Sequence, residues 1–344
     1  MGQTTRQIVL KRFIDGAPSP NDFEIVERTL PDLQEGEFLV RNILVSVDPG
    51  TRARLSGKPS YIPPLRLGDL VGAFSIGEIV ESRHPKFAAG DLVALAEGWS
   101  EHLISKGRGF IRRITDRRLP LSAWLGVLGV SGMTAWFGLH RVAGIREGQT
   151  VVVTSAAGAV GSAAGQIARL NGCRVIGVAG GPDKCGWLTG AARFDAAIDY
   201  KAETDLEAAV RSAAPDGVDI LFDNVGNHMI DRVIPSMNPN GVIVVSGQVA
   251  AYNTDDAPGL MNTRAFITHR LKMQGLVVFD DLPQWSEAER RMADHVAAGE
   301  IAWRDEITDG LESVPEAFAG LFRGENRGRR LARLAPDPFE AEMA

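Results

Sequence analysis

Cysteine is scarce in this sequence of 344 residues. Only Cys173 and Cys185 occur, and they are too far apart to form a C-x-x-C pair. Two thiols spaced in this way indicate neither a disulfide framework nor a structural zinc site. The sequence therefore favours a reducing compartment, and we expect a cytoplasmic protein.

Long hydrophobic runs are missing as well. No stretch approaches the roughly 18 apolar residues of a membrane-spanning helix, and the opening segment "MGQTTRQIVLKRFIDG" lacks the apolar region of a signal peptide. The formal net charge is −6, and no stripe of Lys and Arg offsets it. We therefore expect neither a membrane nor a nucleic-acid partner. The length suggests two globular domains.

The pattern of apolar residues changes twice along the chain. Up to about residue 120, short runs of Val, Ile, Leu and Phe alternate with turn residues, which is typical of an antiparallel sheet. The stretch 120–145 has a helical pattern that stops near Gly144. From Gln149, strands and helices alternate, which indicates parallel βαβ units. The sequence thus predicts a doubly wound α/β domain at 123–303, inserted into a β-rich domain made of 1–122 and 304–344.

A cluster of small residues, "SAAGAVG", joins the first of these parallel strands, "TVVVTS", to its helix. Ala156, Gly158 and Gly161 take the positions of a G-x-G-x-x-G fingerprint. Such a turn lets backbone N–H groups approach a pyrophosphate at a helix N-terminus, and its last glycine lets the helix pack against the strand. Because the cluster follows a strand and opens a helix in a βαβ unit, it predicts nucleotide binding rather than tight packing alone.

The end of the second parallel strand indicates which nucleotide binds. An NAD site has an acidic residue about 20 residues after the glycines, whereas this chain has Ala179, Gly180 and Gly181 there, with Lys184 just beyond. A charged hydrogen bond is worth about 1.5–3 kcal/mol, and about 1.4 kcal/mol is a tenfold preference. The absence of a repelling carboxylate and the presence of an ammonium favour NADPH. The alternative for Lys184 is an exposed lysine at a helix start.

Several segments together resemble one known family. They include "SVDPGTRARLSG", "AAGAVGSAAGQIAR", "GCRVIGVAGGPDKC", "FDNVGN", "KMQGLVVFD" and "ENRGRRL", and they extend along nearly the whole chain. The chain is similar to the zinc-independent medium-chain dehydrogenase/reductases, namely prostaglandin reductases, alkenal double-bond reductases and bacterial curcumin reductases. The resemblance implies a Rossmann domain, a GroES-like substrate domain and a homodimer. It also implies no metal, because "GDLVGAFSIGEIVES" lacks the His-Glu pair of zinc-dependent relatives.

The resemblance also implies a set of contacts with NADPH. Lys184 and Tyr200 would hold the 2′-phosphate, Asn224 would lie near the nicotinamide ribose, and Asn326 would face the carboxamide. Tyr200 is equally compatible with a half-buried strand residue, and Asn224 with a turn former. The full set is Ala157, Gly158, Ala159, Val160, Gly161, Gly180, Lys184, Tyr200, Asn224, Gly247, Val277, Phe279 and Asn326.

The implied reaction is the NADPH-dependent reduction of the carbon–carbon double bond of an apolar α,β-unsaturated ketone or aldehyde. Hydride goes to the β-carbon and a proton to the α-carbon, so the site needs a donor to the carbonyl oxygen and a proton source. The chain has three tyrosines. With Tyr200 at the phosphate, Tyr61 and Tyr252 are the catalytic candidates, and water is the alternative acid. Two other functions stay open: an NADPH-dependent quinone reductase, and a low-turnover NADPH-binding sensor or structural protein.

Overall fold

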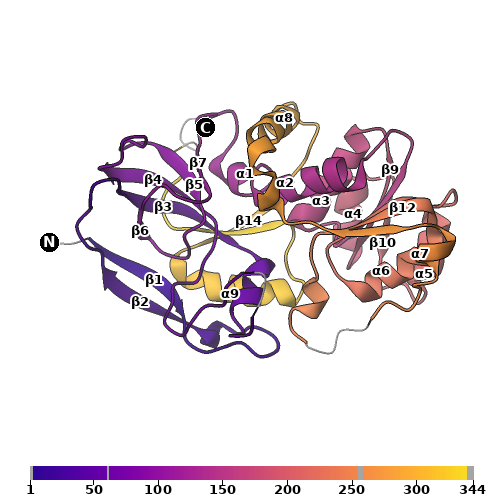
Figure 1. Ribbon diagram of the computed structural model, residues 1–344, viewed down its shortest axis with the longest axis horizontal. Coiled ribbons are helices and arrows are strands. Elements are labelled where there is room, and N and C mark those ends of the chain that lie inside the picture. Colours follow the sequence, from indigo (N-terminus) through magenta and orange to yellow (C-terminus); the bar gives the residue numbers. More distant parts are fainter. Residues whose placement is uncertain (1–2, 60–61, 255–258, 339–344) are drawn as a thin grey trace. The chain divides into compact units, whose positions relative to one another are not determined.

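The computed structural model describes residues 3–59, 62–254 and 259–338. Its chain divides into two compact units. The first unit comprises Met1–Leu125 and Asp305–Ala344, and the second comprises Gly126–Arg304. Since two separate stretches build the first unit, the second unit is an insertion in the chain, as the colours of Figure 1 show.

A mixed sheet organises the first unit. Its strand order is β14-β15-β3-β4-β5-β7, and β6 also pairs with β3. The pair β14–β15 is parallel, and the other pairs are antiparallel. These strands are β3 (Phe38–Val47), β4 (Ser75–Ser82), β5 (Leu92–Leu95), β6 (His102–Ser105), β7 (Ile111–Arg113), β14 (Asp305–Asp309) and β15 (Arg329–Arg333). A separate antiparallel pair consists of β1 (Thr4–Leu10) and β2 (Phe23–Thr29).

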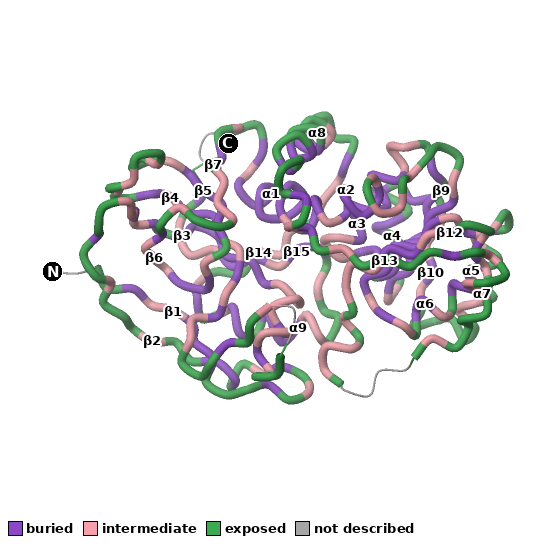
Figure 2. The backbone as a smooth tube through the Cα atoms, in the orientation of Figure 1, coloured by how far each residue is buried: buried purple, intermediate pink, exposed green. Residues whose placement is uncertain are grey.

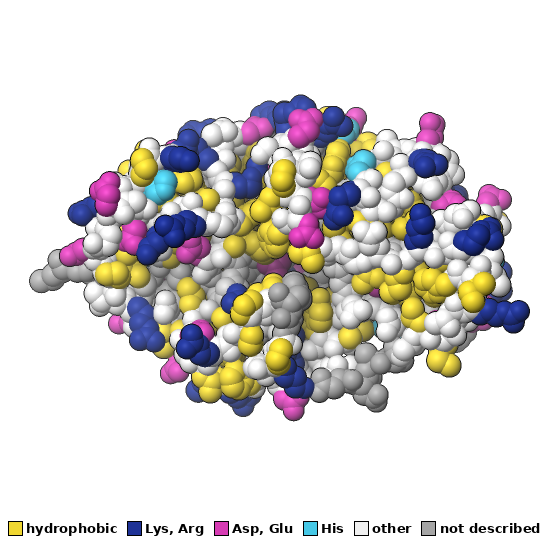
Figure 3. Space-filling model, viewed as in Figure 1, with side chains coloured by type: hydrophobic (Ala, Val, Ile, Leu, Met, Phe, Trp, Pro, Cys, Tyr) yellow, Lys and Arg dark blue, Asp and Glu magenta, His cyan; other side chains and the backbone are white. Residues whose placement is uncertain are grey.

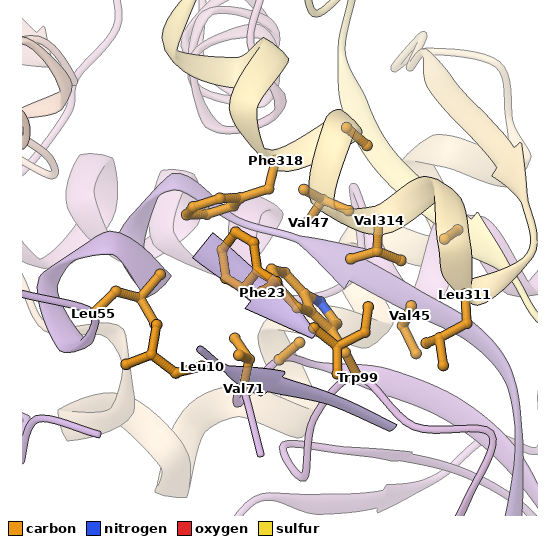
Figure 4. Packing of buried hydrophobic residues seen from close by; sticks show 14 of the residues in the cluster. Leu10, Phe23, Val45, Val47, Leu55, Val71, Trp99, Leu311, Val314 and Phe318 are labelled. Atoms are coloured by element: carbon orange, nitrogen blue, oxygen red, sulfur yellow. The ribbon is translucent and has the colours of Figure 1, made fainter. Parts of the chain in front are cut away.

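Aromatic side chains from both stretches fill the core of the first unit (Figure 4). The rings of Phe23, Trp99 and Phe318 meet edge to face, with centroids 5.6–5.8 Å apart. The Trp99 indole donates to the Ser46 carbonyl oxygen at 2.8 Å, so its polar atom is satisfied despite full burial. The C-terminal segment thus completes the core begun by the N-terminal one. The helices are η1 (Pro20–Asp22), η2 (Pro49–Arg54), α1 (Leu121–Leu125), η7 (Leu311–Ser313) and α9 (Val314–Phe322).

A parallel sheet organises the second unit, with strand order β10-β9-β8-β11-β12-β13. The order reverses between β8 and β11, which is the switch point where doubly wound sheets bind ligands. The predicted fold class is confirmed. The strands are β8 (Thr150–Thr154), β9 (Arg174–Ala179), β10 (Ala196–Asp199), β11 (Val218–Asp223), β12 (Met237–Val245) and β13 (Lys272–Gly275).

Helices cover both faces of this parallel sheet. Figure 1 shows α2 and α3 on one side and α5 and α6 on the other. The strands β8, β9 and β11 of this sheet are mostly buried, as Figure 2 shows for β9. Near-continuous apolar strands such as "TVVVT" are typical of sheets buried on both faces. The helices are α2 (Val130–Phe137), η3 (Gly138–Ala143), α3 (Ala159–Leu170), α4 (Pro182–Thr189), α5 (Leu206–Ala213), α6 (Asn227–Val233), η4 (Ile234–Ser236), η5 (Val249–Ala251), α7 (Ala265–Thr268), η6 (Val278–Gln284) and α8 (Trp285–Ala297).

Two elements differ from the sequence-based expectation. The helix expected over 120–145 is broken, because "GVLG" separates α1 from α2 and glycine is a weak helix former; its predicted stop holds, since Gly144 has φ 62°. The strand expected in "KMQGLVVF" ends at Gly275, because its partner β12 ends at Val245, opposite it. Over the described ranges, we find no helix with the length and hydropathy needed to cross a bilayer.

Candidate functional site

The small-residue cluster forms a tight turn between β8 and α3. Ser155 has a left-handed φ of 47°, and the Ala156 N–H donates to the Val178 carbonyl oxygen at 3.0 Å. A Cβ on Gly161 would lie 2.5 Å from the Ser155 carbonyl oxygen and 2.8 Å from Ala156 Cα. Because both neighbours are backbone atoms, a side chain at position 161 would force the turn and the helix apart. The absence of a side chain on Gly161 therefore lets α3 begin directly against the turn that follows β8.

The start of α3 is suited to an anion. Gly158 is its N-cap, and α3, described throughout, has neither a side-chain cap nor an acidic residue in its first turn. The first N–H groups of a helix lack partners within the helix, and its dipole attracts negative charge there. Gly158, Ala159 and Val160 are half-buried rather than covered, and Ala157 precedes them in the turn. This backbone fits the pyrophosphate of a dinucleotide.

Gly180, directly after β9, adjoins two side chains from the end of β10. A Cβ on Gly180 would lie 2.9 Å from Tyr200 Cε1 and 3.0 Å from Lys201 Cε. Tyr200 follows the strand and is 43% exposed, so it is not a half-buried strand residue. Lys184 is half-buried in the first turn of α4, which begins two residues after Gly180. The predicted residues Gly180 and Tyr200 therefore lie together where an NAD-binding acid would stand.

Lys201 is a candidate that sequence reasoning missed. The signal for it was the parallel strand order, which places the end of β10 beside the end of β9. Asp199 fixes this arrangement, since its Oδ1 accepts the Gly181 N–H at 2.8 Å and the Lys201 N–H at 3.0 Å. These backbone hydrogen bonds, the Gly181 bond foremost, hold the pKa of Asp199 below its ordinary value. The Asp199 carboxylate thus connects the turn after β9 to the turn after β10.

Polar side chains connect the carboxyl ends of β8, β11 and β12. Asn224 Nδ2 donates to the Thr154 carbonyl oxygen at 2.7 Å, and the Asn224 N–H donates to Thr154 Oγ1 at 2.9 Å. Ser246 Oγ donates to Asn224 Oδ1 at 2.6 Å. The side chain of Asn224 therefore braces the strand ends at the switch point. We call Thr154, Asp223, Asn224 and Ser246 the strand-end network.

Asp223 is the member of the strand-end network that sequence reasoning missed. Its side chain is fully buried at the end of β11. Oδ1 accepts the Thr154 hydroxyl at 2.6 Å, and Oδ2 accepts the N–H groups of Gly226 at 2.8 Å and Val225 at 3.3 Å. Burial raises its pKa to about 6, although these hydrogen bonds act in the opposite direction. An acidic residue ending an apolar strand was the available signal.

Tyr252 and Gly247 lie beside the strand-end network. The Tyr252 hydroxyl is 3.8 Å from where a Cβ on Gly247 would stand, and that Cβ would be 3.3 Å from the Asn224 carbonyl oxygen. The structure therefore brings together three predicted residues at the carboxyl edge of the sheet. A pocket of about 60 Å³ lies at the same edge. It is lined by Val225, Gly226, Asn227, His228, Gln248, Ala250, Ala251 and Thr254.

Comparison with known proteins shows which family this chain belongs to. One family model, the N-terminal domain of oxidoreductase, matches residues 6–112, and another, zinc-binding dehydrogenase, matches residues 159–294. The NADPH-dependent curcumin reductase of Escherichia coli is 38% identical over 97% of this chain and 98% of its own. The 2-alkenal reductase (NADP⁺-dependent) of Nicotiana tabacum is 36% identical over 96% of this chain and 98% of its own. The chain belongs to the medium-chain dehydrogenase/reductase family of curcumin, alkenal and prostaglandin reductases.

A solved member of this reductase family has the same fold. CurA from Vibrio vulnificus, whose crystal structure in complex with NADPH is known, is 35% identical with a TM-score of 0.90, covering 97% of this chain and 100% of that one. The quinone oxidoreductase of Escherichia coli shares the fold at 20% identity and a TM-score of 0.80.

The remaining predicted residues of this family member lie in other settings. Val277 precedes η6 and is exposed, and the Phe279 ring stacks on the Trp285 indole with centroids 6.5 Å apart. The next turn of η6 is held by an ion pair from Arg141 Nε to the buried Asp281 Oδ1 at 2.7 Å. Asn326 belongs to the first unit, where its Nδ2 donates to the Gly328 carbonyl oxygen at 3.3 Å. Tyr61 lies outside the described residues.

The surroundings of the two cysteines of this reductase favour the protonated thiol. Cys173 is buried and its thiol contacts the Arg146 carbonyl oxygen at 3.2 Å. Burial raises its pKa to about 11 and also raises the pKa of Cys185. A metal-binding thiol must lose its proton. Within the described residues, no three His, Cys, Asp or Glu side chains gather as a metal site would require.

Proposed function

We propose that this chain reduces the carbon–carbon double bond of α,β-unsaturated ketones and aldehydes, using NADPH. The observation that carries the proposal is that the anion-binding start of α3 and the Tyr252 hydroxyl belong to the same carboxyl edge of one parallel sheet. Ligands of doubly wound sheets bind at this edge. Relatives that are 36–38% identical over nearly their whole length are named for reducing an alkenal and curcumin with NADPH.

Different residues of the second unit bind different parts of the cofactor. The start of α3 binds the pyrophosphate through backbone N–H groups, which the small residues at 156–161 leave accessible. Tyr200, Lys184 and Lys201 bind the 2′-phosphate beside Gly180. When bound, NADPH supplies the hydride that is added to the β-carbon.

Tyr252 is the proposed donor to the substrate. Its hydroxyl carries one O–H donor, which can bind the carbonyl oxygen as negative charge develops there. A donor aimed at such an oxygen contributes about 10²–10³-fold to the rate. The absence of a side chain on Gly247 leaves room beside this hydroxyl. The proton for the α-carbon comes from Tyr252, from Tyr61 or from water. Asn326, Val277 and Phe279 remain proposed contacts with the cofactor.

Three further properties belong to the proposal. The reaction is zinc-independent, since both thiols lie in the second unit with raised pKa values. The protein is cytoplasmic, as its two free cysteines favour. It is a homodimer formed at β13, which ends the sheet of the described second unit and is exposed along its length (Figure 2). Figure 3 shows hydrophobic side chains gathered over α7 and β13, where Ile267 and Met273 are exposed.

The test follows NADPH absorbance with purified protein and a panel of enones, alkenals and quinones, with NADH in parallel. We expect NADPH oxidation with enones and alkenals, and slower use of NADH. Tyr252→Phe should lower kcat by about 10²–10³-fold, because it removes one donor to the developing charge, and it should leave the Kd for NADPH unchanged. Faster turnover of quinones at equal concentration would favour a quinone reductase, and NADPH binding without turnover would favour a sensor or structural protein.

A further inference from the structure

The strand-end network reaches each of the turns that surround the proposed nicotinamide end of the site. Thr154 directly precedes Ser155, the left-handed residue that opens the small-residue turn. Asp223 accepts one hydrogen bond from Thr154 and two from the N–H groups of the turn after β11, at Val225 and Gly226. A single carboxylate therefore joins the turn after β8 to the turn after β11.

The third turn is connected through Asn224. Its Oδ1 accepts the hydroxyl of Ser246, the residue before Gly247, and its carbonyl oxygen accepts the Val249 N–H at 3.3 Å. Val249 begins η5, which leads directly to Tyr252. The main chain of Asp223 takes part as well, since its carbonyl oxygen accepts the Ser246 N–H at 2.9 Å. The position of the Tyr252 turn thus depends on the same strand ends.

In the described parts of the chain, no cationic side chain is paired with Asp223. The groups that face its carboxylate are neutral: the Thr154 hydroxyl from β8, and the amides of Val225 and Gly226 from the following turn. Among the described residues, no charged side chain from β8, β12 or α6 contributes to its pKa. Burying a charge without a counter-charge disfavours the folded state. An uncharged side chain here would avoid that cost, so stability alone does not account for a carboxylate.

We propose that Asp223 is a positioning residue, whose buried carboxylate fixes the turns after β8 and β11 relative to each other and thereby sets how NADPH and Tyr252 are held. The inference rests on the proposed function for the identity of the ligand. The ionised form does the positioning, because a carboxyl group that keeps its proton offers fewer acceptors to the Thr154 hydroxyl and to two N–H groups. Affinity for NADPH therefore decreases when Asp223 takes up a proton.

The experiment measures the Kd for NADPH by cofactor fluorescence between pH 5 and pH 8. The variants are Asp223→Asn, Thr154→Val and Thr154→Ser, with Asp219→Asn as the matched control. Asp219 is on the same strand but near its opposite end, and its carboxylate also accepts a backbone N–H, from Thr150 at 2.8 Å. The 2′-phosphate titrates in the same range, but it does so in every variant, so the ratio of variant to wild-type Kd isolates Asp223.

We expect Asp223→Asn to weaken NADPH binding by about tenfold or more at pH 7.5, the loss of roughly one charged hydrogen bond. The ratio to wild type should shrink toward one at pH 5. Thr154→Ser keeps the hydroxyl and should retain the wild-type Kd, whereas Thr154→Val should not. Asp219→Asn should leave the Kd unchanged.

The inference is overturned if Asp223→Asn keeps the wild-type Kd and pH profile, or if Asp219→Asn weakens binding as much. If Asp223→Asn does not fold, Thr154→Val and Thr154→Ser decide, and equal Kd values for these two overturn it. A wild-type protein that binds NADPH but reduces no enone contradicts the proposed reaction and leaves this Kd test intact. A wild-type protein that does not bind NADPH contradicts both.

Discussion

Replacing Gly180 by aspartate is expected to shift the cofactor preference from NADPH toward NADH. The new Cβ would stand 2.9 Å from the Tyr200 ring and 3.0 Å from the Lys201 side chain. Its carboxylate would stand where NAD-binding proteins of this fold hold the ribose 2′-hydroxyl, and it would repel a 2′-phosphate. Gly180→Ala is the matched control, because it adds the Cβ without the charge.

The two variants separate a steric effect from an electrostatic one. In Gly180→Ala the neighbours are the ends of flexible side chains, so they can rotate away at the loss of about one charged hydrogen bond, 1.5–3 kcal/mol, or roughly 10–150-fold in NADPH affinity. Aspartate adds repulsion of about 4 kcal/mol for each unit of charge at 4 Å and an effective dielectric constant of 20. The NADPH-to-NADH preference should therefore fall by at least about 10²-fold more in Gly180→Asp than in Gly180→Ala.

Fluorescence titration gives the Kd values of both cofactors for the wild type and the two variants. An Asp variant with the wild-type ratio of Kd values would show that Gly180 does not adjoin the 2′-phosphate. If the Ala variant changed the ratio as much as the Asp variant, crowding of Tyr200 and Lys201 would account for the whole effect, and the charge argument would be wrong.

Three other outcomes are expected. Lys201→Ala should weaken NADPH binding about tenfold with little change for NADH, while Lys272→Ala on β13 should change neither; equal losses for both cofactors would contradict the phosphate contact. Gly161→Ala should lower the free energy of unfolding by about 1–3 kcal/mol, measured in urea, and an unchanged midpoint would refute the backbone clash. The pKa of Asp223 is about 6 in the folded state against an ordinary 3.8. The contribution of Asp223 to the free energy of unfolding is therefore fully present below about pH 3.8 and is lost as the pH rises through about 6. At about 1.4 kcal/mol per unit the loss is about 3 kcal/mol, and a stability profile for Asp223→Asn that still shows this decrease would contradict the assignment.

Local patterns in the sequence predicted the second unit well. The run "TVVVTSAAGAVG" specifies a strand, a turn without side chains and a helix start within a few residues of one another, so the turn and the packing role of Gly161 follow from nearest neighbours. The same holds for the helix stop at Gly144. The helix over 120–145 was predicted as continuous because its apolar periodicity outweighed the weakening effect of the glycines in "GVLG".

The missed residues share a different physical origin. Lys201 and Asp223 gain their roles from neighbours supplied by other strands, at Gly180 and Thr154, and a pattern read along the chain contains no such pairing. Parallel strand order alone brings these positions together. Asn326 remains a prediction, since its proposed role depends on contacts with distant parts of the chain, and Tyr61 remains one because it lies outside the described residues.

The pairing of β3 with β15 in the first unit has a consequence for synthesis on the ribosome. β3 ends at Val47, but its partner β15 begins only at Arg329, and the core residue Trp99 is likewise synthesised well before its ring partner Phe318. At about 5–20 residues per second, the nascent chain leaves this sheet edge unpaired for tens of seconds. The inserted unit is complete at Arg304 and can fold while translation continues. The N-terminal strands, although made first, close their sheet last, and a chaperone that shields an open edge would act on them.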